Sequence, residues 1–234
     1  MKSNSPPTVN VIIPAHNEEK SIGKVIAALP PQINEVIVVN NNSTDRTAQI
    51  AQAAGATVLH ENKRGYGHAC LKGIDYLKVK AKPTDILVFL DGDFSDYPEQ
   101  ATQLVAPILT EEVDFVLGAR VKWLRETGAL TPQQIFGNGL ACFLMRQLFQ
   151  STFTDLGPFR AIRWNRLEQL NMSDKTYGWT VEMQLKVLRQ KIPYREIPVA
   201  YRKRIGVSKV SGTVKGTILA GVKIIGWIFK HYLS

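Results

Sequence analysis

Three carboxylates follow directly after an apolar run in the middle of the chain. Residues 86–90 are all apolar, and Asp91, Asp93 and Asp96 come next. A run of this kind is typical of a buried strand, and Gly92 would let a ligand approach the backbone closely. Carboxylates packed this tightly repel one another unless a cation lies among them.

Carboxylate oxygens suit Mg²⁺ or Mn²⁺, and Mg²⁺ is usually held by one or two carboxylates together with substrate phosphates. We therefore predict that Asp91 and Asp93 form a metal site for a diphosphate. The alternative is a polar loop whose aspartates cap a helix that begins near Pro98. The position directly after a buried strand favours the metal.

Segments with strand-like and helix-like periodicity alternate along the chain and would position these aspartates. The expected strands or extended segments cover residues 9–13, 35–39, 57–60, 86–90, 115–119 and 192–201, and a turn at 155–162 enters one more. Three expected helices end at Leu29, Ala54 and Lys78, and four more cover residues 98–109, 133–149, 178–190 and 214–232. Ser43 or Thr44 is expected to cap the helix that ends at Ala54. This alternation predicts an α/β fold, a Rossmann-like and mostly parallel sheet flanked by helices, with ligands at the carboxyl ends of the strands.

Most of the net charge of +9 lies in the last part of the chain. From Tyr201 onward there are seven lysines and arginines and no acidic residue. No nucleic-acid-binding signature accompanies them, so we expect an anionic membrane surface rather than nucleic acid as partner. The N-terminal residues lack an apolar export signal, and Cys70 and Cys142 have no disulfide or zinc spacing. These features predict a cytoplasmic protein that could lie peripherally at the cytoplasmic membrane face.

The expected C-terminal helix, residues 214–232, is amphipathic. Lys215, Lys223 and Lys230 share one side, and the lysines interrupt the apolar run before it reaches the length of a spanning helix. We expect this helix to lie on a membrane surface, or else to pack on the domain or on a second copy of the chain in a homo-oligomer. The predicted division is a catalytic domain at residues 1–205 and a basic tail at residues 206–234.

Five ordered motifs together resemble a known family. They cover residues 11–19, 40–47, 62–67, 91–93 and 204–209. The chain resembles the family-2 glycosyltransferases of the GT-A fold, especially the branch of dolichol-phosphate mannose synthase and other polyprenyl-phosphate glycosyltransferases. One departure is that Asn40 and Asn41 replace the usual acidic pair that contacts the nucleotide, which leaves uridine and guanosine both open.

The resemblance implies roles for particular residues. Donor-binding positions would be Pro14, Ala15, Asn17, Glu18, Asn40, Asn41, Lys63, Gly67, Asp91 and Gly92. Phosphate- or acceptor-binding positions would be Arg120, Arg160, Arg204, Ser208 and Lys209, although Arg120 and Arg160 could equally form structural ion pairs. Catalytic positions would be Asp91, Asp93, Glu182 and Arg204, with the metal on Asp91 and Asp93.

The implied chemistry is sugar transfer from a nucleotide-sugar donor, a UDP- or GDP-sugar, with inversion. A cation on the two aspartates would stabilise the departing nucleoside diphosphate. A polyprenyl phosphate acceptor, with a second pKa of roughly 6, is already an anionic nucleophile and needs no base. A soluble hydroxyl acceptor would need one, and Glu182 is the carboxylate whose position resembles it, unless it is an ordinary first-turn glutamate. A third hypothesis is a protein that binds nucleotide sugars without catalysis.

Overall fold

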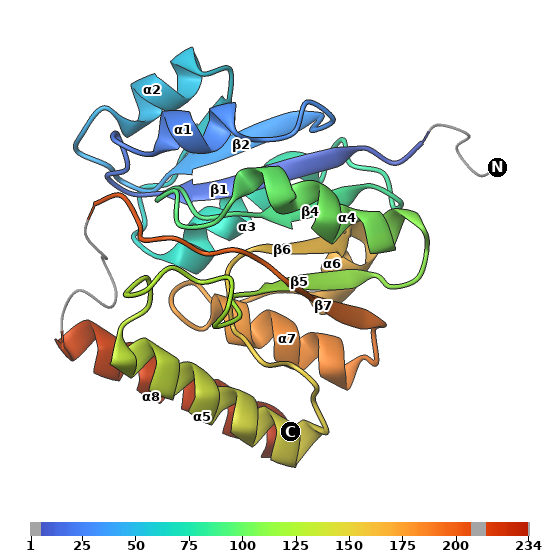
Figure 1. Cartoon of the computed structure of the whole chain (residues 1–234). Coiled ribbons are helices and arrows are strands. Elements are labelled where there is room, and N and C mark those ends of the chain that lie inside the picture. Colours follow the sequence, from blue (N-terminus) through green and yellow to red (C-terminus); the bar gives the residue numbers. More distant parts are fainter. Residues whose placement is uncertain (1–5, 207–213, 234) are drawn as a thin grey trace.

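A computed structural model describes residues 6–206 and 214–233, except for the side chains of 214–220. Its centre is a seven-stranded sheet with the strand order β3-β2-β1-β4-β6-β5-β7. The strands are β1 (Val9–Ala15), β2 (Glu35–Asn40), β3 (Thr57–His60), β4 (Ile86–Phe89), β5 (Phe115–Ala119), β6 (Arg160–Arg163) and β7 (Tyr194–Pro198). Figure 1 shows the helices packed around this sheet.

Strand direction confirms the prediction of a mostly parallel sheet. β1 pairs in parallel with β2 on one side and with β4 on the other, and β6 alone runs antiparallel to its neighbours. From β1 the chain first adds β2 and β3 outward and then returns to place β4 on the opposite side. The carboxyl ends of β1 and β4 therefore flank a switch point, where ligands bind in sheets of this kind.

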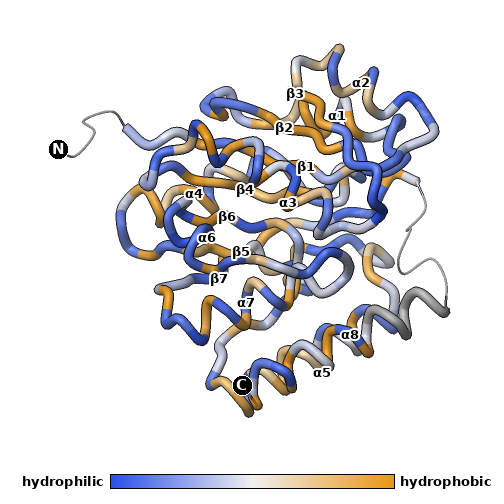
Figure 2. Tube along the Cα trace, turned by 180° about the vertical axis from the view of Figure 1, so that it is seen from behind, coloured by the Kyte–Doolittle hydropathy of each residue, from blue (hydrophilic) through white to orange (hydrophobic). Residues whose placement is uncertain are grey.

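Successive side chains along the strands alternate between two apolar layers, one on each face of the sheet. In β1, Ile12 faces one layer while Val11 and Ile13 face the other. Apolar side chains cover both faces because a mostly parallel sheet is buried on both. The first face carries α3 (Tyr66–Leu77), α5 (Pro132–Phe149), α6 (Trp164–Leu170), α7 (Trp179–Arg189) and α8 (Val214–Leu233). The second carries α1 (Ile22–Ala27), α2 (Thr47–Ala53) and α4 (Ala101–Leu109). Figure 2 shows the hydrophobic strands enclosed between these layers.

One local prediction about a helix start is wrong. α2 begins at Thr47 without a side-chain cap, because Ser43 and Thr44 bond instead to the backbone and side chain of Asn17. The helix expected from Pro98 is confirmed, with its first three residues as a 3₁₀ turn (Pro98–Gln100) that continues into α4. No side-chain cap is present at either start, so the alternative in which the aspartates after β4 serve as caps is not observed. The short helix α6 was not expected at all.

The C-terminal helix packs back on the domain, as one of the alternatives anticipated. α8 lies alongside α5 and against α7, with Ile228 fully buried and the Phe149 and Tyr232 rings edge to face at 6.1 Å (Figure 1). Its opposite side leaves Val222, Phe229 and Leu233 exposed. Among the described residues, no helix combines the length and apolar character required to cross a bilayer.

Candidate active site

The aspartates after β4 form a buried cluster at the switch point. Asp93 is 4% exposed, and its Oδ1 accepts hydrogen bonds from the backbone N–H and hydroxyl of Ser95. The buried Oδ1 of Asp91 and both carboxylate oxygens of Asp96 have no hydrogen-bond partner within the protein. Ionising all three carboxylates would therefore place negative charge here that the protein alone does not fully compensate.

The electrostatics of this cluster fit a cation. Burial and the neighbouring charge of Asp93 raise the pKa of Asp91 to about 7. Burial, together with Asp91 and Asp93, also raises the pKa of Asp96 well above the ordinary carboxyl value. Across residues 6–206 and 214–233 there is no ready-made group of three His, Cys, Asp or Glu ligands. Two carboxylates completed by substrate phosphates would be the usual arrangement for Mg²⁺.

Arg204, a predicted phosphate-binding residue, lies at the aspartate cluster. Its Nη2 is 2.9 Å from Asp93 Oδ2 and 3.5 Å from Glu18 Oε1. The chain before it is fixed because the guanidinium of Arg202 stacks on the Phe94 ring at 3.5 Å and donates to the Phe94 carbonyl. A cation held by Asp91 and Asp93 would therefore share the Asp93 carboxylate with Arg204.

The expected donor-binding residues of the first two strands meet beside this cluster. Pro14 and Ala15 end β1, and Asn17 follows in a left-handed conformation with φ of 55°. Glu18 is buried and accepts a hydrogen bond from the hydroxyl of Ser21. A Cβ built on Gly92 would touch Ala15 and Glu18, so the backbone of the metal motif lies directly against this loop.

The two asparagines at the end of β2, Asn40 and Asn41, contact different parts of the protein. Asn40 donates to the imidazole of His60, and its buried Oδ1 has no partner within the protein. Asn41 donates to the carbonyls of Glu61 and Lys63 and accepts from the N–H of Gly65. Asn41 therefore organises the loop at residues 62–67, hereafter the glycine loop, which carries Lys63.

Gly67 has a packing role that the sequence did not reveal. The carbonyls of Asp174 and Lys175 occupy the space where side chains of Gly67 and Gly65 would lie. Gly65 also has φ of 147°, which disfavours other residues. Contact with residues 173–178, hereafter the bridge segment, explains both glycines without a ligand.

Two of the expected functional side chains, Arg160 and Glu182, are fully buried. Arg160 donates to the carbonyls of Gly157 and Thr180. Because β6 runs antiparallel, Arg160 begins its strand at the ligand edge, but its side chain points into the protein, where it cannot meet an acceptor phosphate. Glu182 accepts from the N–H groups of Ser173 and Asp174 and pairs with Lys186 at 2.7 Å. It braces the bridge segment, and both of its oxygens are bonded within the protein.

Arg120 forms the structural ion pair that was its alternative role. Its Nε and Nη2 donate to the two oxygens of Asp155 at 2.7 and 2.8 Å. This bidentate pair holds the pKa of Asp155 below its ordinary value despite burial. Ser208 and Lys209 lie outside the described residues, so their predicted roles stay predictions.

A hollow of about 320 Å³ at the carboxyl end of β5 was missed by sequence reasoning. Its wall combines Arg120, Lys122 and Arg125 with the apolar side chains of Trp123 and Ile135. Tyr201 connects the hollow to the aspartate cluster, because it pairs by single bridges with both Asp96 and Arg125. The sequence signal was the basic and aromatic run that follows β5.

Comparison with known proteins decides the family. Residues 10–170 match the sequence model described as Glycosyl transferase family 2. The chain belongs to glycosyl transferase family 2. This confirms the resemblance found in the motifs.

Relatives of this family 2 chain are similar over almost its whole length. A glycosyltransferase of Mycobacterium tuberculosis is 32% identical over 219 residues, which are 91% of this chain and 94% of the relative. The dolichyl-phosphate hexose transferase of Haloferax volcanii is 28% identical over 218 residues, 89% of each protein.

A solved structure confirms the fold expected for family 2. Glucosyl-3-phosphoglycerate synthase from Mycobacterium tuberculosis, in complex with Mn²⁺, uridine diphosphate and glucosyl-3-phosphoglycerate, matches 96% of this chain and 80% of its own with a TM-score of 0.75. At 21% identity, this likeness shows that the family 2 chain has the GT-A fold.

Proposed function

We propose that this family 2 protein transfers a sugar from a UDP- or GDP-sugar to a polyprenyl phosphate. The observation that supports a polyprenyl phosphate as acceptor is the hollow beside the aspartate cluster. Besides Arg120, which is paired with Asp155, it offers two cationic side chains, Lys122 and Arg125, and two large apolar ones, as an amphipathic lipid phosphate requires. The similarity to a dolichyl-phosphate hexose transferase supports the same acceptor class.

Asp91 and Asp93 would hold a Mg²⁺ or Mn²⁺ ion together with the donor diphosphate. When bound, the ion supplies positive charge that stabilises the departing nucleoside diphosphate. Solved GT-A neighbours contain Mn²⁺ or Mg²⁺ together with uridine diphosphate, which supports this cofactor. Arg204, already paired with Asp93, adds fixed charge at the same place.

The burial of Glu182 favours a phosphate acceptor over a hydroxyl acceptor. A lipid monophosphate, whose second pKa is about 6, attacks as an anion and requires no proton removal. Of the carboxylates, Glu182 was the one nominated as base for a hydroxyl, and both of its oxygens are already bonded within the protein. The basic groups around the hollow would orient the attacking phosphate.

The face of α5 and α8 would meet the membrane surface. Phe136 is 73% exposed and Phe143 is 54% exposed on α5, while Val222 and Phe229 are exposed on α8. The tail from Tyr201 onward contains no acidic residue, so an anionic bilayer would attract it. We propose residues 1–205 as the catalytic domain and 206–234 as this membrane-contacting tail, with Ser208 and Lys209 meeting phosphates there.

The alternative is a small phosphorylated hydroxyl compound as acceptor. The cationic wall of the hollow would also bind a free phosphate, and a GT-A neighbour was solved with phosphoglyceric acid. In this case the apolar face of α8 would serve contact with a second copy.

The test is a transfer assay with Mn²⁺ and a panel of labelled UDP- and GDP-sugars. Each donor is offered to undecaprenyl or dolichyl phosphate in anionic vesicles and, separately, to phosphoglycerate. Label that partitions with the lipid, and falls at least tenfold in Arg125→Gln, supports the proposal. Label found only in the soluble acceptor would support the alternative, and no transfer by any donor would support binding without catalysis.

A further inference from the structure

The bridge segment, residues 173–178, lies between α8 and the glycine loop. On the glycine-loop side, the N–H of His68 donates to the carbonyl of Lys175 at 3.1 Å. The carbonyl of Asp174 covers Gly67 so closely that a Cβ there would overlap it. A shift of the bridge segment would therefore move the glycine loop or leave a gap beside it.

The catalytic domain fixes the inner side of the bridge segment. Asp174 is 4% exposed, and its Oδ1 accepts from the N–H groups of Thr176 and Gly178 at 2.7 and 3.1 Å. Glu182 on α7 accepts from the N–H groups of Ser173 and Asp174. These bonds set the local shape of the segment, and they leave Asp174 Oδ2 for another partner.

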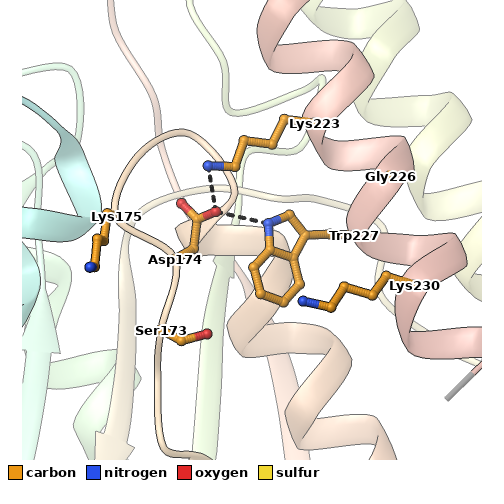
Figure 3. A pocket seen from close by; sticks show the side chains of 7 residues that line it. All are labelled: Ser173, Asp174, Lys175, Lys223, Gly226, Trp227 and Lys230. Carbon is orange, nitrogen blue, oxygen red and sulfur yellow. Dashed lines mark hydrogen bonds and ion pairs between the residues drawn. The ribbon is translucent and has the colours of Figure 1, made fainter.

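That partner is α8. Trp227 Nε1 donates to Asp174 Oδ2 at 2.8 Å, and Lys223 Nζ lies 2.7 Å from the same oxygen (Figure 3). Lys223 also bonds to the hydroxyl of Thr176. Burial alone would raise the pKa of Asp174, but Lys223, Thr176 and Trp227 together lower it, so the carboxylate is charged and held by α8.

The contact is more specific than helix packing requires. Trp227 and Lys223 belong to one turn of α8 and converge on one carboxylate oxygen at the edge of a hollow of about 530 Å³ (Figure 3). Apolar packing of α8 comes from the buried Ile228, from Ile224, from Tyr232 against Phe149 and from the ring, not the N–H group, of Trp227. The polar junction can therefore be removed without removing the core contact of the helix.

We propose that Asp174, Lys223 and Trp227 are positioning residues through which α8 sets the glycine loop for donor binding. The chain of contacts runs from α8 to Asp174, then through the carbonyls of Asp174 and Lys175 to the glycine loop, which Asn41 holds on its other side. Loss of the junction would lower donor affinity and leave the turnover of bound donor nearly unchanged, because none of the three side chains lies at the aspartate cluster. The effect on donor affinity rests on the proposed function, whereas the mechanical coupling does not.

The experiment uses Lys223→Met and Trp227→Phe in the full chain. Trp227→Phe keeps an aromatic ring and removes the N–H donor. The matched control is Lys230→Met, which removes an equal charge from the same helix; Lys230 packs over the Trp227 ring at 4.9 Å. The measurements are KM and kcat for the donor with Mn²⁺, and amide hydrogen exchange of residues 62–68 in the protein without ligand.

Both junction variants are expected to raise the donor KM by about tenfold, the size of one lost hydrogen bond to a charged group, with kcat within about twofold. They are also expected to speed exchange at residues 62–68, while Lys230→Met changes neither quantity. Unchanged exchange in both variants, an equal effect in Lys230→Met, or a fall in kcat without a rise in KM would overturn the proposal. If the wild type transfers no sugar, the proposed function fails, and the exchange experiment still tests the coupling.

Discussion

The ion pair between Arg204 and Asp93 makes a quantitative prediction about metal binding. In Arg204→Met the nearly buried carboxylate of Asp93 loses its nearest positive charge, which lies at 2.9 Å. Breaking a fully buried pair costs about 3 to 5 kcal/mol and breaking an exposed one about 0 to 1 kcal/mol. Because the Arg204 side chain is 32% exposed, an intermediate loss of about 1 to 3 kcal/mol is expected in the metal-free protein.

Arg204→Met is expected to have the opposite effect on metal binding. Arg204 competes with the cation for Asp93, so removing it should tighten Mn²⁺ binding in the absence of donor and increase the stabilisation that Mn²⁺ gives. Sugar transfer should nevertheless fall, because the fixed charge near the diphosphate is lost.

The assay is thermal unfolding with and without Mn²⁺. Each kcal/mol corresponds to about 2 to 4 °C for a chain of this size. The control is Lys203→Met, which removes the same charge from an exposed side chain 3.8 Å from Glu126. We expect a larger rise in melting temperature on adding Mn²⁺ for Arg204→Met than for wild type. A rise equal to or smaller than that of wild type would refute competition at Asp93.

Three further predictions test separate parts of the account. Glu182→Gln should lower the unfolding free energy by about 1 to 3 kcal/mol in urea titrations, because Glu182 braces a buried segment, while the pH profile of kcat stays unchanged. Loss of the acidic limb of that profile would indicate that Glu182 acts as a base. Arg163 and Arg166 lower the pKa of Asp114 despite partial burial, so this carboxylate stabilises the fold above the ordinary carboxyl pKa and the contribution fades as pH falls through the lowered value. Asp114→Asn should therefore be less stable than wild type at pH 7, and the gap should narrow as the pH falls below the ordinary carboxyl pKa; a gap independent of pH would contradict the ion-pair origin. Phe136→Ser with Phe143→Ser should weaken binding to anionic vesicles at least fivefold in flotation assays with little change in melting temperature; undiminished binding would argue against this face as the membrane contact.

Local sequence patterns were sufficient to predict the strand that leads into the site and the aspartates at its carboxyl end. The apolar run of β4 and the aspartates after it define a strand and its carboxyl end within one short stretch. The motif that contains Arg204 singled this residue out for phosphate contacts, but its ion pair with Asp93, 111 positions away in the sequence, became visible only in the structure. Strand periodicity and short motifs both depend on residues that are close together in the sequence, so they can be recognised without the structure.

Contacts between distant segments could not be predicted in the same way. Nothing near Arg160 indicates that β6 is antiparallel, and nothing near Glu182 shows that the N–H groups of the bridge segment surround it. The pairing of Trp227 with Asp174 spans 53 positions and depends on where α8 packs. Periodicity predicted that α8 is amphipathic, but it could not distinguish between packing on the domain and lying on a membrane.

The account depends most on a cation shared by the aspartates after β4 and a nucleotide donor. Calorimetric titration of UDP- and GDP-sugars with and without Mn²⁺ tests this directly in wild type, Asp91→Asn and Asp93→Asn. Asp85→Asn is the control, because Asp85 caps the opposite end of the same strand region by bonding to the N–H groups of Thr8 and Lys82. We predict donor binding that requires Mn²⁺ in wild type and in Asp85→Asn and that is lost in both other variants. Equal donor affinity with and without Mn²⁺, or full binding by Asp91→Asn and Asp93→Asn, would contradict it.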